Sequence, residues 1–179
     1  FLRSRVLLCD IRGNENGTCD KLQAHKEGLL HKAFSVFIFD NDGKLLIQKR
    51  EQEKYHSGGL WANTCCSHYM SGEHVLQTAN KRLQEELGFT CNSLKKKFSF
   101  VYNLDCGNGM HEHEFDTVIY GTFEKNAVII PNMDEVSEHR WIKMDDLRKE
   151  IEQSPNNYAP WFKKILVRIG ILSRNITKI

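Results

Sequence analysis

Residues 61–68 read WANTCCSH and hold two adjacent cysteines, followed two positions later by a histidine. In an extended segment the side chains alternate between two faces, so we expect Cys66 and His68 on one face and Cys65 and Ser67 on the other. A thiol and an imidazole on one face can form part of a metal site, a nucleophile with its base, or an acid beside a metal ligand. The sequence of the neighbouring segments is needed to distinguish these three kinds of site.

The clearest helix of the chain follows this stretch, over residues 73–87. Its apolar residues recur at helical spacing and predict one buried stripe, formed by Val75, Leu76, Ala79, Leu83 and Leu87. Gly88 is expected to end the helix as a left-handed cap. Because residues three and four apart lie together, another face gathers Thr78, Arg82, Glu85 and Glu86. That face is either solvated, with an Arg82–Glu86 ion pair, or part of a functional site.

The remaining segments predict mostly strands, with helices at the C-terminal end. The expected strands are residues 5–10, a hairpin partner after the turn at 13–17, and then 33–39, 44–49, 98–104, 112–123 and 138–143. We expect a polar connector at 22–30, a loop at 57–59, and helices at 145–153 and 160–169. This order favours an α/β (α+β) sandwich over a doubly wound sheet, in which strands and helices alternate strictly. The length predicts a single domain over residues 1–179.

Composition and charge narrow the class of protein. The chain is 40% hydrophobic and 27% charged, as is ordinary for a soluble globular protein. Its net charge of +2 is too small to indicate a nucleic-acid or anionic membrane partner. No apolar run approaches the roughly 20 residues that span a bilayer. No signal-peptide pattern is present, and we interpret Phe1 in place of Met as a sequence that begins inside a longer chain.

The cysteines point to a reducing environment. The six cysteines, at positions 9, 19, 65, 66, 91 and 106, form neither a C-x-x-C zinc pair nor a secreted disulfide framework. Adjacent Cys65 and Cys66 have poor geometry for a disulfide with each other. We therefore expect a cytoplasmic protein.

A second dense cluster is HEHE at residues 111–114. In a strand, Glu112 and Glu114 share one face, roughly 7 Å apart, and His111 and His113 share the other. Two neighbouring carboxylates repel each other and need a cation or a shared proton. The cluster therefore predicts either a functional carboxylate pair or a polar, solvated hairpin end.

Further histidines could complete a metal site with these carboxylates. Together, His25, His31, His68, Glu112 and Glu114 would supply three nitrogen and two oxygen ligands and leave one octahedral position open. A mixed set of this kind suits Zn²⁺, Mn²⁺ or Mg²⁺.

The glycine-containing loop, the Cys-His stretch and the glutamate helix together resemble a degraded Nudix box. Ser67 stands where the motif has its first glycine, Glu73 fits its first acid, and residues 85–89, EELGF, match its end. Lys81-Arg82 replaces the motif's Arg-Glu, so a carboxylate that hydrolysis usually needs for its metals is missing. The resemblance predicts the Nudix fold but argues against ordinary Nudix hydrolysis.

Five segments, taken in order, look like type I isopentenyl diphosphate isomerases: HKAFS (31–35), NTCCSH (63–68), EELG (85–88), EHE (112–114) and PWF (160–162). The resemblance runs from about residue 21 to 162. Tyr69 replaces a common proline, and Ser57-Gly58-Gly59 replaces a more usual proline-glycine. The family implies a Nudix-like α/β/α sandwich with a mixed sheet, and interconversion of isopentenyl and dimethylallyl diphosphate for isoprenoid biosynthesis.

The resemblance also implies roles for residues. Cys66 and Glu114 would flank the substrate on opposite faces, Tyr102 would hydrogen-bond near Glu114, and Trp161 would offer its ring to a cationic carbon. The diphosphate would bind Lys21, Arg50, Lys54, Ser67 and Arg82. A second ion, Mg²⁺, would bridge the diphosphate to Glu86 and the Cys66 carbonyl. The expected partner is thus a small-molecule diphosphate, with no nucleic acid or membrane, and the expected state is a monomer or weak dimer.

Two alternatives remain from the sequence. A Nudix hydrolase acting on a nucleoside diphosphate derivative is disfavoured by Lys81-Arg82. A zinc-binding interaction module would use His25, His31, Cys66 and His68, and chelation would then unfold the domain.

Overall fold

A computed structural model describes residues 4–54 and 56–178 of the chain. Within these residues a nine-stranded sheet is accompanied by four α-helices. The elements are β1 (Arg5–Cys9), β2 (Glu15–Asp20), α1 (Lys21–Glu27), β3 (His31–Phe39), β4 (Leu45–Arg50), β5 (Trp61–Ala62), β6 (Cys65–Ser67), α2 (Val75–Leu87), β7 (Lys95–Asp105), β8 (His111–Thr122), β9 (Val136–Ile142), α3 (Met144–Gln153) and α4 (Pro160–Arg168), with short 3₁₀ helices at Pro155–Asn157 and Arg174–Lys178.

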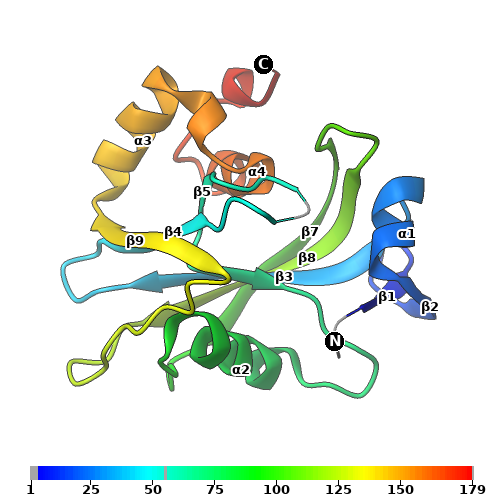
Figure 1. The fold of residues 1–179 in the computed structure, drawn as a ribbon, viewed down its shortest axis with the longest axis horizontal. Helices are drawn as coiled ribbons and strands as arrows, with labels where there is room; N and C mark the ends of the chain where they lie inside the picture. Colours follow the sequence, from blue (N-terminus) through cyan, green and yellow to red (C-terminus); the bar gives the residue numbers. More distant parts are fainter. Residues whose placement is uncertain (1–3, 55, 179) are drawn as a thin grey trace.

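The molecule has three layers. Figure 1 shows α2 on one face of the sheet and α3 and α4 on the other, with α1 beside the end of the sheet formed by β1 and β2. The sheet is mixed, because β3 runs parallel to β8 while its pairings with β1, β4 and β6 are antiparallel. The predicted α+β sandwich with a mixed sheet, a central helix and C-terminal helices is confirmed.

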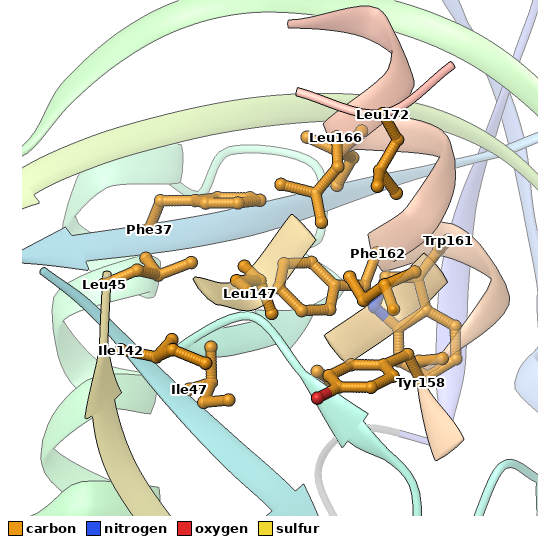
Figure 2. Packing of buried hydrophobic residues seen from close by; sticks show 14 of the residues in the cluster. Phe37, Leu45, Ile47, Ile142, Leu147, Tyr158, Trp161, Phe162, Leu166 and Leu172 are labelled. Carbon is orange, nitrogen blue, oxygen red and sulfur yellow. The ribbon is translucent and has the colours of Figure 1, made fainter. Parts of the chain in front are cut away.

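Alternation along the central strand β3 divides the core in two. Phe34, Val36 and Ile38 pack in one cluster with the apolar stripe of α2. Phe37 faces the other way, into a cluster with α3 and α4. Figure 2 shows this second cluster, in which Phe162 of α4 packs against residues of the sheet. A strand with both faces covered by helices must be apolar on both, as β3 is over most of its length.

The site lies where two strands diverge. Within the described residues, β3 and β4 pair at one register position, Phe39 with Leu45. Beyond it, β6 pairs with β3 and β5 pairs with β4. The WANTCCSH segment, which carries β5 and β6, therefore lies between the two diverging strands.

The central helix agrees with the sequence prediction. It begins at Val75, two residues later than expected, and Gly88 caps it with a left-handed φ of 76°. Four residues of the predicted stripe are buried and Leu76 is partly buried. Helix α3, helix α4 and strands β7 to β9 also lie where the pattern predicts, with no end shifted by more than three residues.

Two predictions about the N-terminal region are wrong. Residues 22–30 are not a connector throughout, because Lys21–Glu27 forms α1, capped by the Asp20 side chain and ended by Gly28. The first hairpin turns earlier than predicted, since the Asp10 carboxylate accepts hydrogen bonds from the Arg12 and Asn14 backbones. Strand β2 therefore begins at Glu15 and contains the Asn-Gly pair that the sequence assigned to the turn.

Among the described residues, the structure contains no helix with the length and apolar character needed to cross a membrane.

Candidate active site

A cavity of about 380 Å³ opens where β3 and β4 diverge. Twelve of the fourteen sequence-predicted site residues line it: Lys21, Arg50, Lys54, Cys66, Ser67, His68, Arg82, Glu86, Tyr102, Glu112, Glu114 and Trp161. The other two, His25 and His31, are fully buried and contact its wall through His68. The structure thus brings together side chains from α1, α2 and α4, from five strands, and from the segments that follow β4 and β6.

One end of the cavity holds a compact group of three histidines and a carboxylate, which we call the histidine group. The ligand atoms of His25, His31, His68 and Glu114 all lie within 4.8 Å of one another. Register explains part of this, because His31 of β3 is directly paired with Glu114 of β8. Helix α1 supplies His25, so the helix that the sequence missed positions one of the predicted ligands.

Backbone carbonyls orient two of the three imidazoles. The Nδ1 atoms of His25 and His31 lie 2.6 and 2.7 Å from the carbonyl oxygens of Lys21 and Leu29. A carbonyl can only accept, so each Nδ1 donates its N–H, and in the neutral ring Nε2 keeps its lone pair. Carbonyl contacts of this kind are typical behind metal-ligating histidines.

The electrostatics of the histidine group suit a cation. Burial lowers the pKa of His25 and of His68 to about 4 each, so both rings are neutral at physiological pH, as metal ligation requires. Burial acts in the same direction on His31, but Glu114, 3.5 Å away, raises the His31 pKa overall. Glu114 therefore favours a protonated His31 when no divalent cation is bound. The donor set fits such a cation.

Glu112 lies in a neighbouring group that shares His25. The ligand atoms of Glu112, His25 and His56 lie within 4.8 Å of one another, and His56 Nε2 is 3.0 Å from Glu112 Oε1. The five predicted ligands therefore divide between two overlapping groups. The sequence analysis missed His56, because it belongs to the loop after β4, where no periodicity marks a buried residue.

The two glutamates of β8 are buried side by side, as the strand alternation predicts. Tyr102 of β7 donates its hydroxyl to Glu114 Oε2 at 2.6 Å and lies 3.4 Å from Glu112 Oε2. Burial and the neighbouring Glu114 raise the pKa of Glu112. Burial also acts to raise the pKa of Glu114, but His31 and His68 outweigh it and hold that pKa well below its usual range. Glu114 is therefore the carboxylate that stays ionised.

The adjacent cysteines face opposite ways. Cys65 is fully buried in the cluster against α2, whereas Cys66 lines the cavity with His68. Cys66 pairs with Ser35 of β3, which sets its direction. Burial raises the pKa of the Cys66 thiol, so it carries its proton at neutral pH. Its Sγ lies 3.2 Å from Asn63 Oδ1 and 3.6 Å from Ser35 Oγ.

Asn63 links the thiol to the aromatic wall of the cavity. Its Nδ2 donates to the carbonyl oxygens of Val36 and Cys65, which fixes the orientation of the amide. Its Oδ1 accepts from the Trp161 indole N–H at 3.3 Å as well as from Cys66. The Trp161 ring is thereby held next to the thiol.

Asp116 is a further buried acid that the sequence analysis did not single out. It follows Glu112 and Glu114 on the same face of β8 and accepts a 2.8 Å hydrogen bond from Ser35 Oγ. Burial and Glu114 raise its pKa. The two-residue alternation that paired the glutamates could have identified it.

A further set of side chains that line the cavity is basic. We call Lys21, Arg50, Lys54 and Arg82, all of which line it, the cationic group. Arg82 Nη2 lies 2.5 Å from Glu86 Oε1, so the predicted ion pair exists and also faces the cavity. Gln48 Nε2 donates to Glu86 Oε2 at 3.3 Å. The sequence analysis missed Glu135, which pairs with Lys54 here.

Comparison with known proteins assigns the chain first to a class. Residues 29–162 match the NUDIX domain family. A crystal structure of a Deinococcus radiodurans protein has the same fold, with a TM-score of 0.70 at 18% identity, covering 92% of this chain and 98% of that one. The MutT protein of Methanosarcina mazei gives a TM-score of 0.61 at 16% identity, over 78% and 91% of the two chains. The fold is therefore that of a NUDIX domain, as predicted.

Sequence relatives then define the particular family. Isopentenyl-diphosphate Delta-isomerase 2 of Photorhabdus laumondii is 46% identical over 161 residues, which cover 90% of this chain and 89% of the relative. Isopentenyl-diphosphate Delta-isomerase 2 of Aromatoleum aromaticum is 41% identical over 168 residues, covering 94% and 87%. The chain belongs to the isopentenyl-diphosphate Delta-isomerase family.

Proposed function

We propose that this chain is an isomerase that interconverts isopentenyl and dimethylallyl diphosphate. One observation carries the proposal. A thiol, Cys66, and a carboxylate, Glu114, line one cavity from the two strands that flank β3, and the four basic side chains of the cationic group line the same cavity. The family assignment agrees with this chemistry.

The reaction moves a double bond by one position without net gain or loss of protons. One proton adds to the terminal carbon of the allylic unit, and another leaves the carbon at its other end. Cys66 and Glu114 are the groups that we assign to these two transfers. The raised pKa of the Cys66 thiol and the lowered pKa of the Glu114 carboxylate support one proton held by the pair. Each well-placed acid or base contributes about 10²- to 10⁴-fold.

Other side chains orient the reacting pair. Tyr102 holds Glu114 by its hydroxyl, and Asn63 holds both the Cys66 thiol and the Trp161 ring. The face of an indole stabilises positive charge, and the apolar ring helps to exclude water from a cationic carbon. Excluding water is what separates isomerisation from hydration.

His25, His31, His68 and Glu114 would hold one divalent cation, with Glu112 beside them. Mn²⁺, Zn²⁺ and Mg²⁺ each suit this mixed donor set. When bound, the cation supplies a Lewis acid that polarises the Glu114 carboxyl group. We also assign His31 and His68 the role of keeping the Glu114 carboxylate ionised and fixed in direction.

The diphosphate of the substrate would bind the cationic group and Ser67. Arginine suits bidentate contacts with phosphate oxygens, and lysine acts as a point charge. Mg²⁺ would join the diphosphate to Glu86 and the Cys66 carbonyl. The Glu86 carboxylate has lone pairs left for such an ion beside its bonds to Arg82 and Gln48.

We also propose that residues 1–179 act as one isomerase domain. Helix α1 supplies Lys21 and His25, and helix α4 supplies Trp161, so both ends of the chain contribute to one site. A small-molecule diphosphate is the only partner that the proposal needs, with the protein as a monomer or weak dimer. A cytoplasmic location agrees with the six cysteines, all in the described residues and all free thiols.

The test is to incubate the purified protein with isopentenyl diphosphate and a divalent metal, and to follow the methyl signals of dimethylallyl diphosphate by NMR. We expect conversion in both directions, to the same equilibrium mixture. A parallel incubation with nucleoside diphosphate derivatives should release no phosphate. Phosphate release without isomerisation would replace the proposal with Nudix hydrolysis.

A further inference from the structure

Glu135 is a carboxylate placed among the cations of the cavity. It lines the cavity just before β9 and forms an ion pair with Lys54 Nζ, while its other oxygen lies 3.8 Å from Arg82 Nη2. Backbone bonds fix its position, because its N–H donates to the Asn132 carbonyl and its own carbonyl accepts from the Glu51 N–H. Its carboxylate thus contacts two of the residues assigned to the diphosphate.

The two carboxylates at the cationic group differ in how firmly they are held. Glu86 is 4% exposed and is bonded to both Arg82 and Gln48, so it is a fixed part of the wall. The Glu135 side chain is 27% exposed and its partner Lys54 is 22% exposed. Solvent screens this partly exposed pair more than it screens Glu86, and long exposed side chains keep more rotamer freedom. Glu135 can therefore leave its cations at lower cost than Glu86.

The charge of the cavity explains why a displaceable carboxylate such as Glu135 would be useful there. Five basic side chains line the cavity with Glu86, Glu135 and Glu85, and without an anion the cations repel one another. Burial acts to raise the Glu135 pKa, but Lys54 outweighs it and lowers that pKa, so Glu135 is an anion at neutral pH. A diphosphate brings more negative charge to the same place, where it would meet Glu135 as a like charge.

We propose that Glu135 is an exchangeable internal anion, which holds Lys54 and Arg82 in the free protein and gives them up to the diphosphate of the substrate. The inference rests on the proposed function of the cationic group and extends it. Glu135 keeps the binding side chains in place before substrate arrives. It also lowers diphosphate affinity, because substrate must displace it, and so favours product release.

Glu135→Gln tests this directly, because it keeps the shape and removes the charge. The probe is inorganic diphosphate, titrated by calorimetry in the presence of EDTA. We expect about tenfold tighter binding by the variant, equivalent to about 1.4 kcal/mol. In the isomerase assay KM for isopentenyl diphosphate should fall by a similar factor without a rise in kcat.

Glu85→Gln is the matched control. Glu85 also contacts Arg82, at 2.5 Å, but its side chain is 38% exposed and, among the described residues, it forms no ion pair with Lys54. Its loss should change diphosphate affinity by less than about twofold, which distinguishes displacement from a general gain in positive field.

The outcomes separate the inference from the proposed function. Unchanged or weaker binding by Glu135→Gln, or an equal gain in Glu85→Gln, would overturn the exchange role while leaving the isomerase proposal intact. Failure of the wild type and Glu135→Gln alike to bind diphosphate would overturn the assignment of the cationic group itself. Thermal unfolding of each variant establishes that a folded protein is being compared.

Discussion

The sharpest prediction concerns the two adjacent cysteines, which differ by one position and face opposite sides of the sheet. Cys66→Ala removes a thiol that lines the cavity, and Cys65→Ala removes one packed against α2. If Cys66 carries a proton in the reaction, its loss should reduce kcat by about 10²- to 10⁴-fold. The neighbouring substitution should leave kcat within about threefold, because the Cys65 side chain packs in the cluster against α2, on the face opposite to Cys66.

Thermal stability should show the reverse order, with Cys65→Ala less stable than Cys66→Ala. Cys65 is fully buried, so truncation leaves a small cavity that costs about 1 kcal/mol. In a chain of this length that lowers Tm by roughly 2–4 °C. Cys66 is partly exposed to the cavity, and after its loss Asn63 Oδ1 still accepts from Trp161, so Cys66→Ala should unfold within about 2 °C of the wild type.

The assay is conversion of isopentenyl diphosphate under saturating metal and substrate, with thermal unfolding measured on the same preparations. An inactive, stable Cys66→Ala beside an active, slightly destabilised Cys65→Ala would support the orientation. An active Cys66→Ala with an inactive but folded Cys65→Ala would refute the argument from strand alternation.

Three further predictions address the other parts of the site and the fold. Tyr102→Phe removes the hydroxyl bonded to Glu114 and should lower kcat by about 10- to 100-fold with little change in KM, measured by steady-state kinetics; an unchanged kcat would exclude the contact from catalysis. Chelation should abolish activity while circular dichroism still shows a cooperative thermal transition, whereas unfolding on chelation would favour the zinc module. Hydrogen bonds from Arg140 and Tyr158 lower the pKa of Glu150, so its stabilisation is complete above the ordinary pKa of 4.5 and is lost as pH falls through the folded value. Glu150→Gln should therefore show a shallower loss of Tm as the pH falls below about 4.5, and the effect should be small because the pair is partly exposed. The same dependence of Tm on acid pH in the variant and the wild type would contradict this prediction.

Alternation made the strand-borne part of the site predictable. Cys66 with His68, and Glu112 with Glu114, share faces because the side-chain period of a strand is two whatever the strand packs against. To predict which side chains share a face, it is enough that the segment is extended, whatever its position in the sheet. The directions of these side chains therefore followed from local sequence alone.

Residues outside regular periodicity were harder to find. Helix α1 has only seven residues, of which Ala24 and His25 are buried, so no apolar stripe marks it. His56 and Glu135 lie in connecting segments, where burial depends on how the loop folds over the cavity. The division of the predicted ligands into two groups sharing His25 depends on distances of a few ångströms, which sequence spacing does not specify.

The most direct test of the central claim is deuterium incorporation in heavy water. Isopentenyl diphosphate should gain deuterium in a methyl group as it becomes dimethylallyl diphosphate in the presence of the wild-type protein and metal. Glu114→Gln and Cys66→Ala should each suppress this incorporation. Conversion without deuterium uptake, or uptake that persists undiminished in both variants, would contradict a proton exchange carried by this thiol and this carboxylate.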